Sequence, residues 1–140
     1  MTREDKKNWL SRYRKYYPVI RQARSDLDSM TILKAVQYDQ VKSDTNAHSD
    51  LSDVVARREE LIAECHRTLY RGIELFSEIL HKIETLDDDR QKDILHCYYL
   101  LAWSIDRMED EFELTARWVY KEIGKAVDAL EFTPEEIASC

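Results

Sequence analysis

The chain has 140 residues, of which 44% are hydrophobic and 35% charged, and its formal net charge is −7 at pH 7. This composition is typical of a folded globular protein and argues against disorder. There are only two glycines and two prolines, too few for the turns that sheets and phosphate-binding loops need. No apolar stretch approaches the roughly 20 residues that span a bilayer, and no hydrophobic leader follows the N-terminus. We therefore expect an all-α protein that is neither membrane-inserted nor secreted.

The cysteines and histidines give no pattern of a metal or disulfide site. Cys65, Cys97 and Cys140 are scattered and form no CxxC pair, which suits a reducing cytoplasm. Neighbours such as Cys65-His66 and His96-Cys97 point about 100° apart on a helix, a poor arrangement for one metal ion. Nucleophile-elbow, P-loop and zinc-protease motifs are absent from the sequence. We expect no metal, no cofactor and no enzymatic activity.

Charge is distributed unevenly along the chain. Residues 1–34 carry nine basic and four acidic side chains, whereas residues 87–133 carry six basic and twelve acidic ones. A basic N-terminal segment on an acidic protein fits a contact with nucleic acid. The charge pattern alone favours the alternative, a solvated helix face that pairs with acidic neighbours.

The first 30 residues have the spacing of a helix that packs against a partner, because apolar positions recur at alternating steps of four and three. Pro18 interrupts this pattern, so we expect a kink or a helix restart near Tyr17. The basic residues between the apolar positions are expected mostly on the solvent side. The apolar positions are Trp9, Tyr13, Tyr16, Ile20, Ala23, Leu27 and Met30. The basic ones are Arg12, Arg14, Lys15, Arg21 and Arg24.

A polar connector near residues 35–50 precedes a second long helix. The connector loses the apolar period and gathers Asp, Ser, Thr and Asn, and Ser49 or Asp50 can cap the helix that follows. That helix has an apolar series from Leu51 to Ile83. Residues 1–85 therefore predict an antiparallel helical hairpin, although a coiled-coil dimer satisfies the same pattern.

Three shorter helices are predicted after the hairpin. Acidic residues 87–89 can cap a helix over residues 90–101. Ser104 can cap a second helix, and Thr115 a third one after a brief turn at residues 113–114. Their apolar faces contain Ile94, Leu95, Tyr98 and Leu101, then Ile105, Met108 and Phe112, and finally Val119, Ile123, Ala126, Val127 and Leu130.

These helices describe a helix-turn-helix module over residues 86–133, followed by a tail over residues 134–140. The stretch from Leu86 to Leu130 resembles region 4 of bacterial sigma factors, in the version of the phage ArpU/RinA-like late-transcription regulators. Residues 9–13 and 48–53 are similar to other segments of the same phage proteins. The matching residues of the module are Leu86, Ile94, Leu95, Tyr99, Ser104, Met108, Phe112, Thr115, Val119, Tyr120, Ala126, Val127 and Leu130.

The chain departs from the family at two turn glycines, which are replaced by Ala102 and Glu113. A positive φ at Glu113 would cost about 1 kcal/mol without abolishing the turn.

The resemblance implies a transcription regulator in the cytoplasm of a bacterial host. Its partners would be double-stranded promoter DNA, RNA polymerase, or both, with a homodimer as one source of affinity. In this reading Thr115 caps the recognition helix and donates to a phosphate. Ala116, Arg117 and Lys121 lie on the face that enters the major groove, where Arg117 would read a guanine.

Three further residues, Trp118, Tyr120 and Lys125, would flank that face and touch the DNA backbone. An alternative for Trp118 is packing against the first helix of the module. For Arg117 and Lys121 the alternative is a solvated face that pairs with nearby carboxylates.

A different function remains open because the second helix of the module is acidic. It carries Asp106, Glu109, Asp110, Glu111 and, at its end, Glu113. Such a surface could imitate DNA and occupy a basic groove. The scaffold would then act as a phage or mobile-element inhibitor of a basic host protein.

Overall fold

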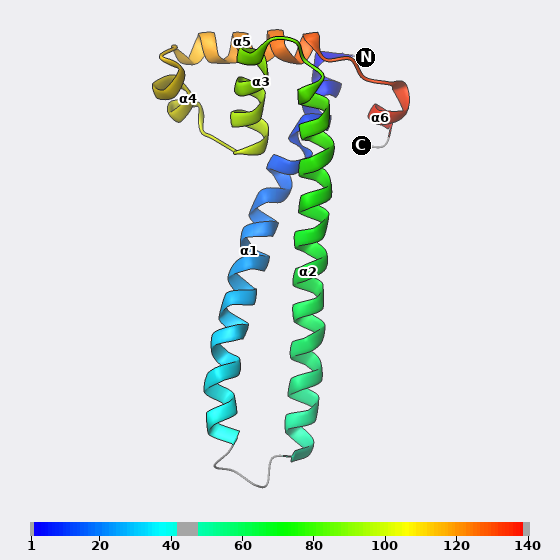
Figure 1. Ribbon diagram of the computed structural model, residues 1–140, viewed down its shortest axis with the longest axis vertical. Helices are drawn as coiled ribbons and strands as arrows, with labels where there is room; N and C mark the ends of the chain where they lie inside the picture. The colour runs from blue at the N-terminus through cyan, green and yellow to red at the C-terminus, as the bar shows by residue number, and fades with distance from the viewer. Residues whose placement is uncertain (1, 42–47, 139–140) are drawn as a thin grey trace. The chain divides into compact units, whose positions relative to one another are not determined.

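The computed structural model describes residues 2–41 and 48–138, and no strand occurs among them (Figure 1). The all-α prediction is confirmed. None of the described helices is long and apolar enough to cross a membrane. The helices are α1 (Arg3–Val41), α2 (His48–Glu84), α3 (Asp89–Leu95), the π-helix η1 (His96–Leu100), α4 (Ile105–Phe112), α5 (Ala116–Ala129) and α6 (Pro134–Ala138).

The chain divides into two units. Residues 1–17 and 73–140 form one, which we call the compact unit, and residues 18–72 form the other, which we call the hairpin unit. This division differs from the predicted boundary near residue 85, because the first turns of α1 and the last turns of α2 share the core of the helix-turn-helix. That core is formed by Trp9, Leu10, Ile79, Ile83, Leu86, Ile94, Leu95, Tyr99, Leu100, Met108, Val119, Ile123, Ala126, Val127 and Leu130.

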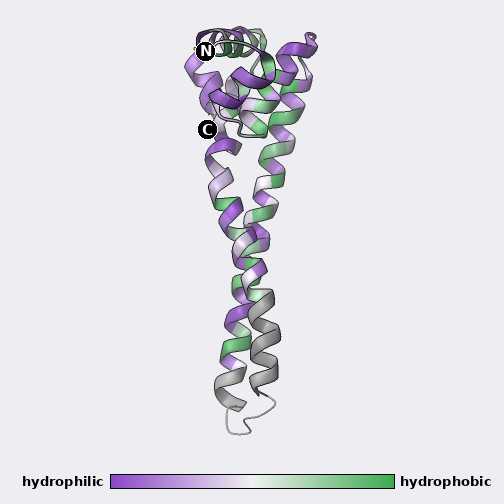
Figure 2. Cartoon of the chain, turned by 90° about the vertical axis from the view of Figure 1, so that its left-hand side faces the viewer, coloured by the Kyte–Doolittle hydropathy of each residue, from purple (hydrophilic) through white to green (hydrophobic). Residues whose placement is uncertain are grey.

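The hairpin unit consists of the distal parts of α1 and α2, which run antiparallel side by side (Figure 1). Hydrophobic residues recur along both arms between longer hydrophilic stretches (Figure 2). Regular helix extends further than predicted, since α1 continues to Val41 and α2 begins at His48. The predicted caps Ser49 and Asp50 therefore lie inside α2. Polar residues cost a helix only up to about 0.7 kcal/mol each, so the polar composition alone did not end these helices.

Two further expectations for this region have different outcomes. The centre of the predicted connector, residues 42–47, lies outside the described residues. Of the two outcomes predicted near Tyr17, a kink or a restart, the restart is wrong, because α1 passes through Pro18 without a break. Proline removes one backbone donor and clashes locally with the preceding turn, but the helix is continuous on both sides of it.

All three helices of the module begin at the predicted caps. The Asp88 carboxylate accepts hydrogen bonds from the backbone N–H groups of Arg90 (2.9 Å) and Gln91 (3.2 Å). The Ser104 hydroxyl caps α4, and the Thr115 hydroxyl caps α5 by accepting from the Trp118 N–H at 3.4 Å. Side-chain caps of this kind fix where a helix starts and stabilise it by about 1 kcal/mol each.

The first helix of the module ends in a π-turn that the sequence pattern did not predict. The N–H of Leu101 donates to the carbonyl of His96 at 3.0 Å, a bond five residues long. A π-turn inserts one extra residue into the helical period, so the buried face shifts. Tyr99 and Leu100 are buried, whereas the predicted inner residue Leu101 is 46% exposed and Tyr98 only half-buried.

Ala102 and Glu113 both adopt the left-handed conformation, with φ of 55° at each. The positive φ expected at Glu113 is confirmed. The turns on either side of α4 keep a glycine-like backbone without glycine, at a cost of about 1 kcal/mol each.

Candidate nucleic-acid interface on the helix-turn-helix

Helix α5 is buried along one side only. Val119, Ile123, Ala126 and Val127 face the core as predicted, with exposures of 3% or less. Arg117, Lys121 and Lys125 follow one another at steps of four, so they lie along the opposite side of α5. All three are exposed. The outer side of α5 therefore carries these three residues, which we call the basic row.

The basic row has few carboxylates beside it. The Nζ atom of Lys125 lies 3.8 Å from the Glu122 carboxylate, a weak exposed pair. The Nζ atom of Lys121 lies 4.5 Å from the centre of the Trp118 ring, which orients the ammonium group over the aromatic face. Of the remaining predicted site residues, Thr115 is exposed and Ala116 half-buried at the first turn of α5.

The two aromatic site residues are on the surface of α5. Trp118 is 47% exposed and Tyr120 57% exposed. Trp118 is not among the residues of the core cluster or those packed against it. The two rings flank the basic row, because positions 118 and 120 lie about 160° apart around the helix.

The structure adds Arg3 to this surface, a residue that the sequence analysis did not select. Its guanidinium group donates two hydrogen bonds to the Asp128 carboxylate, one of them from Nε at 2.8 Å. A Cβ atom at Gly124 would lie 3.2 Å from Arg3 Nη1, so the glycine admits the guanidinium against α5. The hydrogen bond from Arg3 also lowers the pKa of Asp128. A glycine inside a helix costs about 1 kcal/mol of stability. Gly124 within α5 was therefore the sequence signal that could have pointed to the close approach of Arg3.

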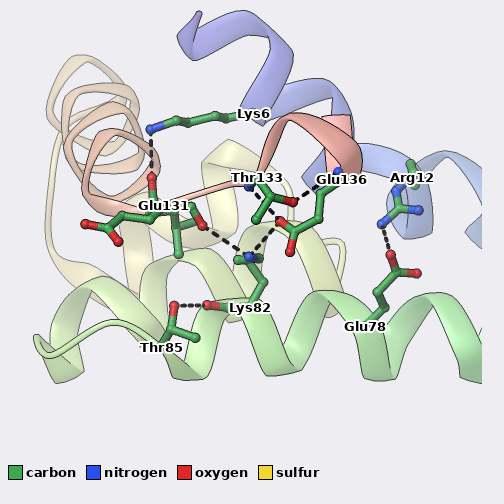
Figure 3. Close-up of polar contacts among 9 residues, drawn as sticks. Lys6, Arg12, Glu78, Lys82, Thr85, Glu131, Thr133 and Glu136 are labelled. Atoms are coloured by element: carbon green, nitrogen blue, oxygen red, sulfur yellow. Dashed lines mark hydrogen bonds and ion pairs between the residues drawn. The ribbon is translucent and has the colours of Figure 1, made fainter. Parts of the chain in front are cut away.

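Lysines from α1 and α2 fix the end of α5 (Figure 3). Lys6 Nζ donates to the carbonyl of Leu130 at 2.7 Å, where the helix leaves its last carbonyls without partners. Lys82 Nζ donates to the carbonyl of Glu131 at 3.1 Å and pairs with the Glu136 carboxylate at 2.8 Å. The predicted tail is thus partly helical, since α6 carries Glu136 onto Lys82.

Two arginines of α1 depart from the expected solvent-facing position. The Arg12 guanidinium lies 4.3 Å from the centre of the Trp9 ring and bonds Glu78 at 3.0 Å. Arg14 Nη1 donates to the carbonyls of Tyr98 (2.6 Å) and Trp103 (3.1 Å). These carbonyls belong to the π-turn and the link after it. Arg14 therefore donates hydrogen bonds to carbonyls in a stretch where the backbone is irregular.

The outward side of α4 has the opposite charge. Asp106, Asp110, Glu111 and Glu113 are all exposed. The one basic residue of the helix, Arg107, stacks over the Trp103 ring at 4.1 Å. The module therefore joins an acidic helix to a helix with a basic outer row.

The two cysteine–histidine pairs lie in different units of the chain. Cys65 belongs to the hairpin unit and Cys97 to the compact unit, and burial raises the pKa of each thiol. Within the described ranges, no group of three or more potential ligands is arranged to hold a metal ion.

Comparison of the chain with protein-family models, with curated proteins and with solved structures finds no match.

Proposed function

We propose that the chain is a phage-type transcription regulator that binds duplex DNA through α5, in the cytoplasm of a bacterial host. The observation that carries this proposal is the exposed row of Arg117, Lys121 and Lys125 on the last helix of a helix-turn-helix. The recognition helix of such a module enters the major groove with its N-terminal half. Arg117, in the first turns of α5, is the residue proposed to read a guanine edge.

The charge balance determines how strong this binding can be. Phosphate contacts supply most of the affinity for duplex DNA, and the acidic side of α4 opposes them. We therefore propose that the module needs help from dimerisation, from basic residues of α1, or from RNA polymerase. Arg3 of α1 supports this proposal, because it lies over Gly124 beside the basic row and its guanidinium offsets the charge of Asp128 there.

The test is a mobility shift with phage late-promoter DNA at low salt, with and without RNA polymerase. The variant Arg117→Ala/Lys121→Gln/Lys125→Gln should lose binding. Its matched control removes three exposed arginines of α2, Arg57→Gln/Arg67→Gln/Arg71→Gln, and should retain binding. With about three phosphate contacts, log K should fall with log salt at a slope of about −2.7. No shift at micromolar protein under either condition would refute the proposal.

The acidic side of α4 favours a second candidate function, the binding of a basic host protein. Charged surfaces steer association with partners of the opposite sign. In a pull-down from host lysate, a basic partner whose binding competes with DNA would support this function. The charge reversal Asp110→Lys/Glu111→Lys should then abolish capture, whereas it should strengthen binding to DNA under the first proposal.

A further inference from the structure

The guanidinium group of Arg3 is held against α5 along one of its edges. Nε and Nη2 donate to the two oxygens of the Asp128 carboxylate, a paired arrangement that fixes the plane of the group. Nη1 has no hydrogen-bond acceptor among the described residues, and it lies 3.2 Å from the place that a Cβ of Gly124 would take. The Arg3 side chain is 53% exposed. The two N–H donors of Nη1 are therefore available to a ligand.

Arg3 lies over the same side of α5 as the start of the basic row. Gly124 and Asp128 follow Arg117 by seven and eleven residues, and such steps return to one side of a helix. At 1.5 Å per residue, Gly124 lies about 10.5 Å beyond Arg117 along the axis. The major groove of DNA is roughly 12 Å wide. With Arg117 at the base edges, Arg3 would thus meet the phosphates that border the groove.

Basic side chains dominate the charge around Asp128. The hydrogen bond from Arg3, followed by the charges of Arg3, Lys6 and Lys7, lowers the pKa of its carboxyl group. These three basic residues share one side of α1, because they are three and four residues apart. The acidic residues 4 and 5 lie about 100° and 200° around α1 from Arg3. An anion that approaches Nη1 therefore meets a positive potential.

We propose that Asp128 positions Arg3 so that Nη1 binds one phosphate group, and that Gly124 provides the space for the guanidinium. Guanidinium N–H groups match the oxygens of phosphate esters, so the ligand is a phosphate. Asp128 is a positioning residue, which orients Arg3 and does not touch the ligand. For a phosphate of the DNA backbone the inference rests on the proposed function and deepens it. Free phosphate is the other source of the same chemistry.

The sign of one substitution separates positioning from simple charge. Loss of a carboxylate from a DNA-binding surface ordinarily strengthens binding, because the carboxylate repels phosphates. Asp128→Asn should instead weaken duplex binding by at least about threefold, since it releases Arg3. The matched control Asp110→Asn removes the same charge from the exposed side of α4 and should strengthen binding. Fluorescence anisotropy of the full chain with promoter duplex, at several salt concentrations, provides the measurement.

Variants of Arg3 and Gly124 test the geometry of the site. Arg3→Gln should weaken binding by about tenfold and make the slope of log K against log salt less steep by about 0.9. Arg3→Lys keeps the charge but loses the planar fork, so it should not restore the wild-type affinity. Gly124→Leu fills the space of the guanidinium and should weaken binding alone, but cause no further loss in Arg3→Gln. Circular dichroism of each variant shows whether the helices persist.

A second arm separates this site from the proposed function. The Nε–H signal of Arg3 is followed by NMR while inorganic phosphate is added to the full chain. A saturable shift that disappears in Asp128→Asn would support the site even if duplex does not bind, and only the proposed function would then fail. If Asp128→Asn strengthens duplex binding as Asp110→Asn does, the positioning of Arg3 is overturned and DNA binding stands. An Arg3 signal that responds to neither phosphate nor duplex would overturn the site.

Discussion

The two units of the molecule differ in how completely they bury their apolar residues. In the compact unit the largest side chains, among them Trp9, Tyr99 and Ile83, are 2% exposed or less. In the hairpin unit Val19, Val54 and Leu61 are 44–48% exposed. Burial of apolar surface is the dominant stabilising term in folding. The compact unit thus has an extensive buried core, whereas the described residues of the hairpin unit include only three buried apolar side chains, Ile20, Ala23 and Cys65.

The largest expected effect in this comparison is the loss of stability when Trp9 is substituted. Trp9→Ala should lower the free energy of unfolding by about 3–5 kcal/mol, because it empties the centre of the compact unit. Leu61→Ala, at a half-exposed position of the hairpin unit, should cost about 1 kcal/mol or less in the monomer. Denaturant unfolding of both variants provides the measurement. Equal losses would show that the two units do not differ in this way.

The next effect concerns Arg14, which joins α1 to the π-turn. Arg14→Ala removes charge-assisted hydrogen bonds to two carbonyls and should cost about 1.5–3 kcal/mol. Lys15→Ala, at the exposed neighbouring position, should stay within about 0.5 kcal/mol of wild type. Thermal unfolding followed by circular dichroism distinguishes them. An Arg14→Ala variant as stable as Lys15→Ala would mean that the two hydrogen bonds of Arg14 do not hold the module to α1.

A smaller effect is expected where Thr115 starts α5. Thr115→Ala should destabilise the chain by about 1 kcal/mol, and Thr115→Ser, which keeps the hydroxyl, should be close to wild type. Chemical denaturation at equilibrium measures the difference. Indistinguishable Ala and Ser variants would show that the cap contributes nothing.

The opposite sign is expected at Glu113. Glu113→Gly should stabilise the chain by about 0.5–1 kcal/mol, since glycine adopts a positive φ without steric cost. Glu113→Gln removes the same charge but keeps the strain, and it serves as the control. A melting temperature that rises equally in both variants would assign the effect to charge instead.

The smallest effect is the pH dependence of the Arg3–Asp128 pair. Because Arg3 lowers the pKa of Asp128 in the folded state, the pair stabilises the chain above the ordinary pKa of an aspartate. That contribution is lost as the pH falls through the lowered value. Carboxyl NMR titration should show the pKa of Asp128 rising in Arg3→Gln. An unchanged titration would mean that the two side chains do not interact in solution.

The sequence predicted the parts of the fold that depend on local chemistry. The caps Asp88, Ser104 and Thr115 and the buried face of α5 follow from hydrogen-bonding side chains and apolar spacing, and the structure has them. The π-turn after Leu95 was not predictable, because its carbonyls are satisfied by Arg14, which is some 80 residues away in sequence. Local spacing contains no such information.

The candidate site was predictable only in part. The exposed positions on α5 followed from its helical period. The approach of Arg3 to Gly124 depends on tertiary packing that brings the two ends of the chain together. The same holds for the shared core, in which Trp9 and Ile83 complete the helix-turn-helix.

The most direct test of the proposed DNA contact is an amide chemical-shift titration of the full chain with promoter duplex at low salt. We expect the largest shifts at residues 115–125, on the outer side of α5, with smaller ones near Arg3. Shifts confined to α4 or to the hairpin unit, or none at saturating duplex, would contradict the proposal.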